Sequence, residues 1–99
     1  MNFLHLKYFL TVAEELNITR AAERLYISQQ SLSNHIGNLE RELGVKLFTR
    51  SPKLSLTYAG GLLVDTATQI LDLHGQYLSK VGDINKQYVG ALRVGISHT

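Results

Sequence analysis

The sequence predicts a mainly α-helical fold, in which three helices and a two-stranded hairpin form one compact unit and a single long helix follows. Three observations support this prediction. Apolar residues recur at steps of three and four through the first 43 residues, short apolar segments flank Ser51 and Pro52, and a heptad pattern then runs for about three and a half repeats. The 99 residues, 44% of them hydrophobic and 18% charged, favour one folded domain over a disordered chain.

The first two predicted helices lie close together in the sequence. One spans residues 3–16, and Asn17 is expected to end it. Its apolar face consists of Leu6, Phe9, Leu10, Ala13 and Leu16. The next helix is expected to begin with Thr19 as its N-cap residue and to carry Ala21 and Ala22, whose small side chains allow the close approach of another helix.

The third predicted helix covers residues 28–43. Ser28 is a suitable N-cap residue, and Gly44 is a suitable C-cap residue. The apolar face repeats at steps of four, three and four, and it consists of Leu32, Ile36, Leu39 and Leu43. The opposite face begins with amide and hydroxyl side chains, so it is polar but almost uncharged.

A small hairpin and a long helix follow. Residues 46–50 and 53–56 are expected to pair as two short strands with Pro52 in the turn. Thr57 is expected to cap a helix over roughly 58–89, which would be about 48 Å long. Its heptad positions form an apolar stripe, the heptad seam, which consists of Leu63, Ala67, Ile70, His74, Tyr77, Val81, Ile84 and Tyr88. A helix too long for so small a domain to cover predicts that two copies associate through this seam.

The last ten residues differ in pattern from the long helix. Gly90 is expected to end that helix, and the alternating apolar residues of 92–96 predict a strand that has no sheet to join. The chain therefore divides into a compact unit of residues 1–58, a helix of residues 59–89, and residues 90–99 as the beginning of a further domain.

The helices at 19–25 and 28–43, joined by a short turn, have the arrangement of a helix-turn-helix. That motif places the start of its second helix in the major groove of DNA. Glutamine and asparagine amides can pair with adenine through two atoms, and serine can contact several bases. The candidate base-reading residues are Gln29, Gln30, Ser33 and Asn34. The net charge of +2 permits a polyanionic partner without requiring one.

Several short motifs occur along the same region. They are Ala21-Ala22-Glu23-Arg24-Leu25, Ser28-Gln29, Leu32-Ser33, Ile36, Leu39-Glu40, Leu43-Gly44, Leu47-Phe48 with Arg50, and Leu56-Thr57 with Ala59-Gly60. Together they resemble the LysR-type transcriptional regulators over about residues 3–89. The resemblance implies a winged helix-turn-helix, a linker helix that forms a homodimer, and a periplasmic-binding-protein-like effector domain that would begin with residues 90–99. The chain would then be the DNA-binding part of a longer bacterial regulator.

The resemblance also assigns roles by position. The third predicted helix would be the recognition helix in the major groove, and a wing around Lys53 would lie at the minor groove. Gln29 and Ser33 match the family's motif, whereas Gln30 and Ser31 stand where proline and a small apolar residue are commoner. Contacts to the DNA backbone or minor groove are expected from Thr19, Arg20, Ser28, Ser31, His35, Arg50 and Lys53.

Other functions find little support in the sequence. There is no cysteine, and the four histidines lack the spacing of metal ligands, so neither a metal site nor a cofactor is expected. No catalytic constellation is present, so we do not expect an enzyme. No signal peptide or long apolar run is present, so we expect a cytoplasmic protein without a membrane partner. The expected partners are double-stranded DNA carrying an interrupted inverted repeat, a second copy of the chain and, only through the missing domain, a small-molecule effector.

Some alternatives remain open at this point. The low net charge is also compatible with a winged-helix scaffold that binds another protein through its polar face. Arg20 and Arg24 can bind phosphates or pair with Glu23 and its neighbours. His74 can be an ordinary interface residue of the heptad seam or a pH sensor.

Overall fold

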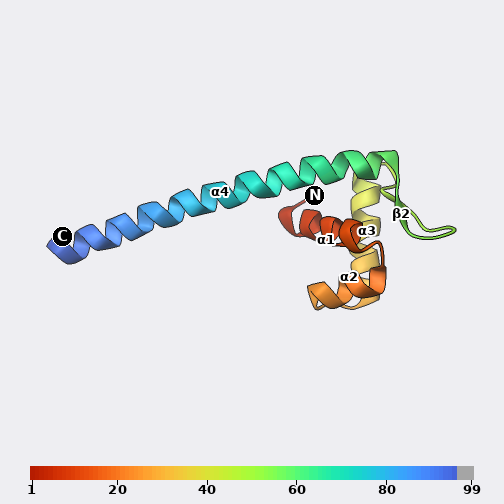
Figure 1. Cartoon of the computed structure of the whole chain (residues 1–99), viewed down its shortest axis with the longest axis horizontal. Helices are drawn as coiled ribbons and strands as arrows, with labels where there is room; N and C mark the ends of the chain where they lie inside the picture. Colours follow the sequence, from red (N-terminus) through yellow and green to blue (C-terminus); the bar gives the residue numbers. More distant parts are fainter. Residues whose placement is uncertain (96–99) are drawn as a thin grey trace.

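The structure is a computed structural model that describes the backbone of residues 1–95 and the side chains of residues 1–86. Its elements are α1 (Phe3–Glu15), α2 (Ile18–Leu25), α3 (Gln29–Leu43), β1 (Phe48–Thr49), β2 (Ser55–Leu56) and α4 (Tyr58–Gly95). The first three helices and the small sheet gather at one end, and α4 runs away from them as a long rod (Figure 1). The overall dimensions are 65 × 25 × 20 Å. The predicted mainly α-helical class is confirmed.

The core lies where one face of each of α1, α2 and α3 meet. Its buried residues are Leu6, Phe9, Val12, Ala21, Ala22, Leu32, Ile36, Leu39, Leu47, Phe48 and Ala67. The rings of Phe9 and Phe48 lie with their centroids 5.4 Å apart, which joins α1 to the first strand. Burial of each large side chain stabilises the fold by about 1.5–3 kcal/mol. This cluster therefore holds the three helices in a fixed mutual orientation.

The junction of α1 and α2 differs from the prediction. The N-cap residue of α2 is Asn17, whose side-chain Oδ1 accepts a hydrogen bond from Arg20 N at 3.0 Å. Leu16 ends α1 in the left-handed conformation with φ 48°. The prediction that Thr19 caps α2 is wrong, because a cap residue precedes the first helical residue and α2 already begins at Ile18. Asn17 therefore lies directly between the C-cap residue of α1 and the first residue of α2, and it caps α2.

The two ends of α3 follow the prediction. α2 ends at Tyr26, which has φ 57°, and a three-residue turn leads to α3. The hydroxyl of Ser28 accepts a hydrogen bond from Ser31 N at 3.0 Å, so Ser28 is the N-cap residue. Gly44 ends the helix with φ 73°, and its N–H donates to Glu40 O at 2.8 Å. These caps fix where α3 begins and ends.

The predicted hairpin is present, and we refer to residues 48–56 as the wing. Its strands are antiparallel, with Phe48 opposite Leu56 and Thr49 opposite Ser55. The two hydroxyls of the second pair lie 2.6 Å apart and share a hydrogen bond. The strands are shorter than predicted because only two residues of each are paired, and the only proline lies in the loop between them.

Helix α4 begins where it was predicted to begin. The hydroxyl oxygen of Thr57 accepts a hydrogen bond from Gly60 N at 3.0 Å, which is the geometry of an N-cap. The side chains of Leu63 and Ile70, in the first turns, are half-buried against the core of the same chain. No helix within residues 1–95 is both long and apolar enough to cross a membrane.

The far end of α4 differs from the prediction. The helix continues to Gly95, so the prediction that Gly90 ends it is wrong, and residues 92–95 are helical rather than extended. A single glycine costs a helix only about 1 kcal/mol, whereas a strand without a neighbour leaves its backbone hydrogen bonds unmade. The remainder of the predicted strand, from Ile96 onward, lies outside the described residues. The assignment of residues 90–99 to the beginning of a further domain stays a prediction.

Candidate nucleic-acid interface

The first two turns of α3 present the predicted base-reading residues at the surface. Gln29, Gln30 and Asn34 are exposed, and Ser33 is half-buried. Because residues four apart lie on the same side of a helix, Gln29 stands above Ser33 and Gln30 stands above Asn34. The four side chains therefore form two adjacent rows at the start of one helix. Such rows can donate hydrogen bonds to base edges and accept hydrogen bonds from them.

The N-terminus of α3 adds backbone donors to this face. The Ser28 hydroxyl already accepts from Ser31 N, so Ser28 acts first as a cap. The N–H groups of Gln29 and Gln30, at the start of the helix, have no carbonyl partner inside it. Free N–H groups at a helix N-terminus, together with the helix dipole, suit a phosphate group. Ser28 is exposed and Ser31 is half-buried beside these donors.

The two arginines of α2 have different surroundings. Arg24 Nη1 donates to Glu14 Oε1 at 2.8 Å and to Glu15 Oε2 at 3.0 Å. The hydrogen bond that Arg24 donates to Glu14, followed by the one that it donates to Glu15, raises the pKa of Arg24 above its ordinary value. Arg20 is exposed and makes no ion pair within the described residues. Arg24 thus joins α2 to the end of α1 rather than pairing with Glu23, whereas the exposed guanidinium of Arg20 is the one that could reach a phosphate.

The wing extends from the C-terminal end of α3, on the side away from the free end of α4 (Figure 1). Arg50 and Lys53, the two cations of its loop, are both exposed. Thr19, expected to contact the DNA backbone, is exposed in the first turn of α2. The residues predicted to contact the DNA backbone therefore lie on several separate elements. The cationic side chains among them, those of Arg20, Arg50 and Lys53, are exposed.

His35 has a different environment from the one expected. Its ring lies 5.3 Å from the ring of His5 and 5.0 Å from that of Tyr8, measured between centroids. The residue is half-buried, and its Nδ1 atom is buried without a hydrogen-bond partner. His35 therefore packs against α1, one position around the helix from the exposed Asn34. Sequence reasoning missed these contacts because they join residues that are 30 and 27 positions apart.

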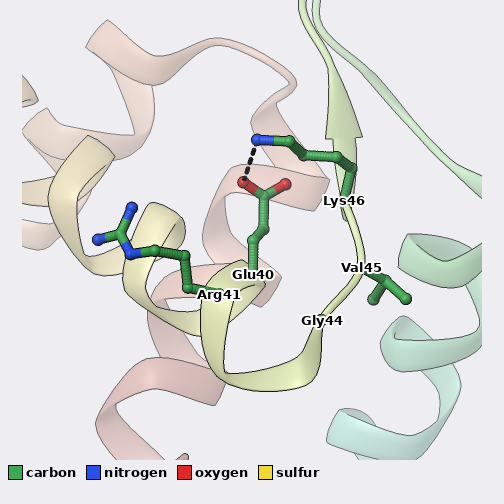
Figure 2. A pocket seen from close by; sticks show the side chains of 5 residues that line it. All are labelled: Glu40, Arg41, Gly44, Val45 and Lys46. Atoms are coloured by element: carbon green, nitrogen blue, oxygen red, sulfur yellow. Dashed lines mark ion pairs between the residues drawn. The ribbon is translucent and has the colours of Figure 1, made fainter.

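Glu40 lies within one of the motifs that carry the family resemblance, but no role was predicted for it from the sequence. Its carboxylate is buried, and Oε2 accepts hydrogen bonds from Leu47 N at 2.7 Å and Phe48 N at 3.3 Å. Figure 2 shows Lys46 reaching over this carboxylate from the strand side, while Arg41 points away from it. A shallow pocket of about 250 Å³ lies beside this pair. The sequence offered one signal for this buried carboxylate, which is an acidic residue four positions after Ile36 on the apolar face of the helix.

The heptad seam divides into two parts. Ala67 is fully buried in its own chain, so the prediction that it contacts a second copy is wrong: α4 crosses the compact unit at this turn. The ring centroids of His74 and Phe3 lie 4.1 Å apart, so His74 also contacts its own chain. Tyr77 and Ile84 are 64% and 62% exposed on the projecting part of the helix. The remaining seam residues are Leu63, Ile70 and Val81, which are half-buried, and Tyr88, whose side chain lies outside the described part.

The projecting part of α4 also exposes apolar residues outside the predicted seam. Leu73 is 64% exposed, and Leu78 is 53% exposed. The apolar surface of this helix is therefore broader than the heptad pattern alone indicates. Among the side chains of residues 1–86, no three histidine, aspartate or glutamate residues lie close enough together to hold a metal ion.

The chain is similar in sequence to known bacterial regulators. The family model described as "Bacterial regulatory helix-turn-helix protein, lysR family" matches residues 3–61. The HTH-type transcriptional regulator BsdA of Bacillus subtilis (strain 168) is 38% identical over 97 residues, which cover 96% of this chain and 33% of BsdA. The chain spans about a third of the length of the curated relatives that it matches first.

Two solved structures have the same arrangement of elements. The BenM_DBD/catB site 1 DNA complex aligns with a TM-score of 0.85 at 36% identity, covering 89% of this chain and 96% of that chain. The CbnR_DBD–DNA complex aligns with a TM-score of 0.81 at 38% identity, covering 86% of this chain and 99% of that chain. The fold is thus that of a winged helix-turn-helix DNA-binding domain.

Proposed function

The chain belongs to the LysR family of bacterial regulatory helix-turn-helix proteins, and from this premise we propose that it recognises double-stranded DNA of defined sequence as a homodimer. The observation that carries the proposal is the pair of polar rows at the start of α3. Gln29, Gln30, Ser33 and Asn34 would enter the major groove and contact base edges. Each good bidentate contact would contribute about 1–3 kcal/mol of discrimination against a wrong base.

Contacts to the sugar-phosphate backbone would hold α3 in register. We propose that Arg20 and the backbone N–H groups at the start of α3 bind phosphates on either side of the groove. Arg50 and Lys53 of the wing would reach the flanking minor groove or its phosphates. Thr19, Ser28, Ser31 and His35 are proposed as secondary contacts, the last of them limited by the packing of its ring against α1.

The projecting part of α4 would form the dimer. Tyr77 and Ile84 expose apolar surface there, and burial of that surface against a second copy is favourable. Two recognition helices held by one pair of α4 helices would bind an interrupted inverted repeat. In a longer protein, a small-molecule effector would act through a further domain, and we expect such a regulator to work in the bacterial cytoplasm.

Two single substitutions, compared with each other, test whether α3 reads bases. Gln29→Ala should weaken binding by about 1–3 kcal/mol, mainly on DNA that carries the preferred base at one position of the selected site. Arg20→Ala should weaken binding to all sequences and lower the slope of log K against log salt by about one. Equal loss on every sequence for Gln29→Ala would contradict its role in direct readout.

The scaffold alternative predicts different behaviour in the same assay. The first 58 residues carry seven basic and five acidic side chains, so electrostatic attraction to DNA is modest. A protein-binding scaffold would show no preference among duplexes and no steep dependence on salt. For a DNA-binding domain, each phosphate that it neutralises should steepen the fall of log K with log salt by nearly one unit of slope. A titration of the wild-type chain against a selected duplex at several salt concentrations separates the two.

A further inference from the structure

Glu40 is a buried acid at the point where the recognition helix meets the wing. Its side chain is 9% exposed, and glutamate is rarely buried unless it is paired. Its Oε2 accepts from the backbone N–H groups of Leu47 and Phe48, and its Oε1 lies 4.0 Å from Lys46 Nζ. A carboxylate of α3 thus holds the base of β1 through two charge-assisted hydrogen bonds.

The backbone oxygen of Glu40 holds the connecting turn as well. It accepts from Gly44 N at 2.8 Å and from Val45 N at 3.2 Å. Four successive contacts, two through the carbonyl and two through the carboxylate, therefore tie the chain between α3 and the wing to one residue. The turn and the first strand cannot rotate relative to α3 without breaking hydrogen bonds at Glu40.

The start of α4 holds the same segment from the other side. Thr57 Oγ1 donates to Lys46 O at 2.7 Å, and Thr57 N donates to Leu47 O at 3.0 Å. A sheet with only two paired residues in each strand is too short to fix its own orientation. The direction of the wing is therefore set at its base, by the contacts of residues 46–48 with Glu40 and with Thr57.

We propose that Glu40 is a positioning residue for DNA binding, whose carboxylate fixes the wing relative to α3 so that both elements engage one duplex at once. The inference rests on the proposed function, because it needs α3 in the major groove and Lys53 on the flank. A wing that is already oriented loses less conformational freedom on binding, which favours affinity. Glu40 touches no DNA in this scheme and acts through the wing.

The substitution Glu40→Gln tests the carboxylate with little change in volume. Glutamine keeps one acceptor oxygen but removes the negative charge from the two hydrogen bonds to the strand. Glu42→Gln is the matched control, because Glu42 lies on the same helix, is half-exposed and pairs with the N-terminal amine instead of the wing. Both variants would be made in the 99-residue chain, with the thermal unfolding midpoint checked for each.

Binding would be measured on two duplexes carrying a site selected from random DNA by the wild-type chain. One duplex keeps the flank beneath the wing, and the other is shortened to remove it. Glu40→Gln should weaken binding to the longer duplex about fivefold, which is roughly 1 kcal/mol, and leave binding to the shorter one unchanged. In a Lys53→Ala background, Glu40→Gln should cause no further loss, because both changes remove the same contact. Glu42→Gln should match the wild type on both duplexes.

Three other outcomes would overturn the inference. They are equal loss on the two duplexes, full additivity with Lys53→Ala, and unchanged amide hydrogen exchange at Leu47 and Phe48 in Glu40→Gln. The first two describe a general loss of stability, and the third describes a wing that needs no carboxylate. Failure of the wild-type chain to prefer any duplex would instead refute the DNA-binding proposal, and the inference would fall with it. The two failures are therefore distinguishable.

Discussion

Replacing Gly60 with alanine should destabilise the domain, although alanine is the better helix former. Gly60 lies in the first turn of α4, where the helix crosses the base of the wing. A Cβ atom at this position would lie 2.1 Å from Leu47 O and 2.9 Å from Leu56 Cδ2. Ordinary contact begins near 3.4 Å, so Leu47 and the helix would have to separate by about 1.3 Å.

The segment that would have to move is held in place by hydrogen bonds. Leu47 N donates to Glu40, and Leu47 O accepts from Thr57 N at 3.0 Å. Overpacking of this kind costs about 1–3 kcal/mol, and weakening of one backbone hydrogen bond costs about 1 kcal/mol more. The helix propensity of alanine offsets at most about 1 kcal/mol. We therefore expect Gly60→Ala to lower the free energy of unfolding by about 1–3 kcal/mol.

Urea-induced unfolding, followed by circular dichroism, measures this difference, with both proteins at one fixed concentration because the apparent stability of a dimer depends on protein concentration. Gly61→Ala is the matched control, because a Cβ at Gly61 would meet nothing within 4 Å. It should leave stability unchanged or raise it by up to about 1 kcal/mol. If the two variants unfolded at the same urea concentration, the close approach of α4 to Leu47 would not exist as described.

Two further predictions concern the helix junction and the dimer. Asn17→Ala should cost about 1 kcal/mol of stability through loss of the cap of α2, whereas Thr19→Ala should change thermal stability little; the reverse order would reinstate Thr19 as the cap. Replacing Tyr77 and Ile84 together with glutamate should convert a dimer to a monomer in sedimentation, because four like charges would meet in the interface while the fold of each chain is untouched. Gln76→Glu, also an exposed change on α4, is the control, and an unchanged dimer in the double variant would exclude this face.

The local elements were largely predictable because their signals are short-range. Ser28 and Gly44 mark the ends of α3 through contacts with residues three or four positions away. Leu32, Ile36 and Leu39 identify its buried face through spacing alone, and all three are buried. The polar rows that carry the candidate site follow from the same periodicity. Thr19 shows the limit of such signals, because Asn17 competes for the same role two residues earlier.

Contacts between distant residues could not be predicted in this way. His35 carries no local mark of its packing against α1, and Glu40 carries only an unusual place on an apolar face. Ala67 fits the heptad spacing equally well whether it faces a partner or its own domain, and burial in its own chain decides the matter. The same spacing cannot separate the part of α4 that crosses the compact unit from the part that projects beyond it.

The sequence by itself determined the helix-turn-helix, the wing, the long helix and the polar face at the start of α3, since each depends on periodicity, caps and neighbouring side chains. Only the tertiary structure decided how these parts are joined. Glu40 of α3 meets residues 46–48 from one side, Thr57 and Gly60 at the start of α4 meet them from the other, and such contacts depend on where the chain returns in space. Their physical basis is a set of directed hydrogen bonds and one close backbone approach, which no spacing rule along the chain encodes.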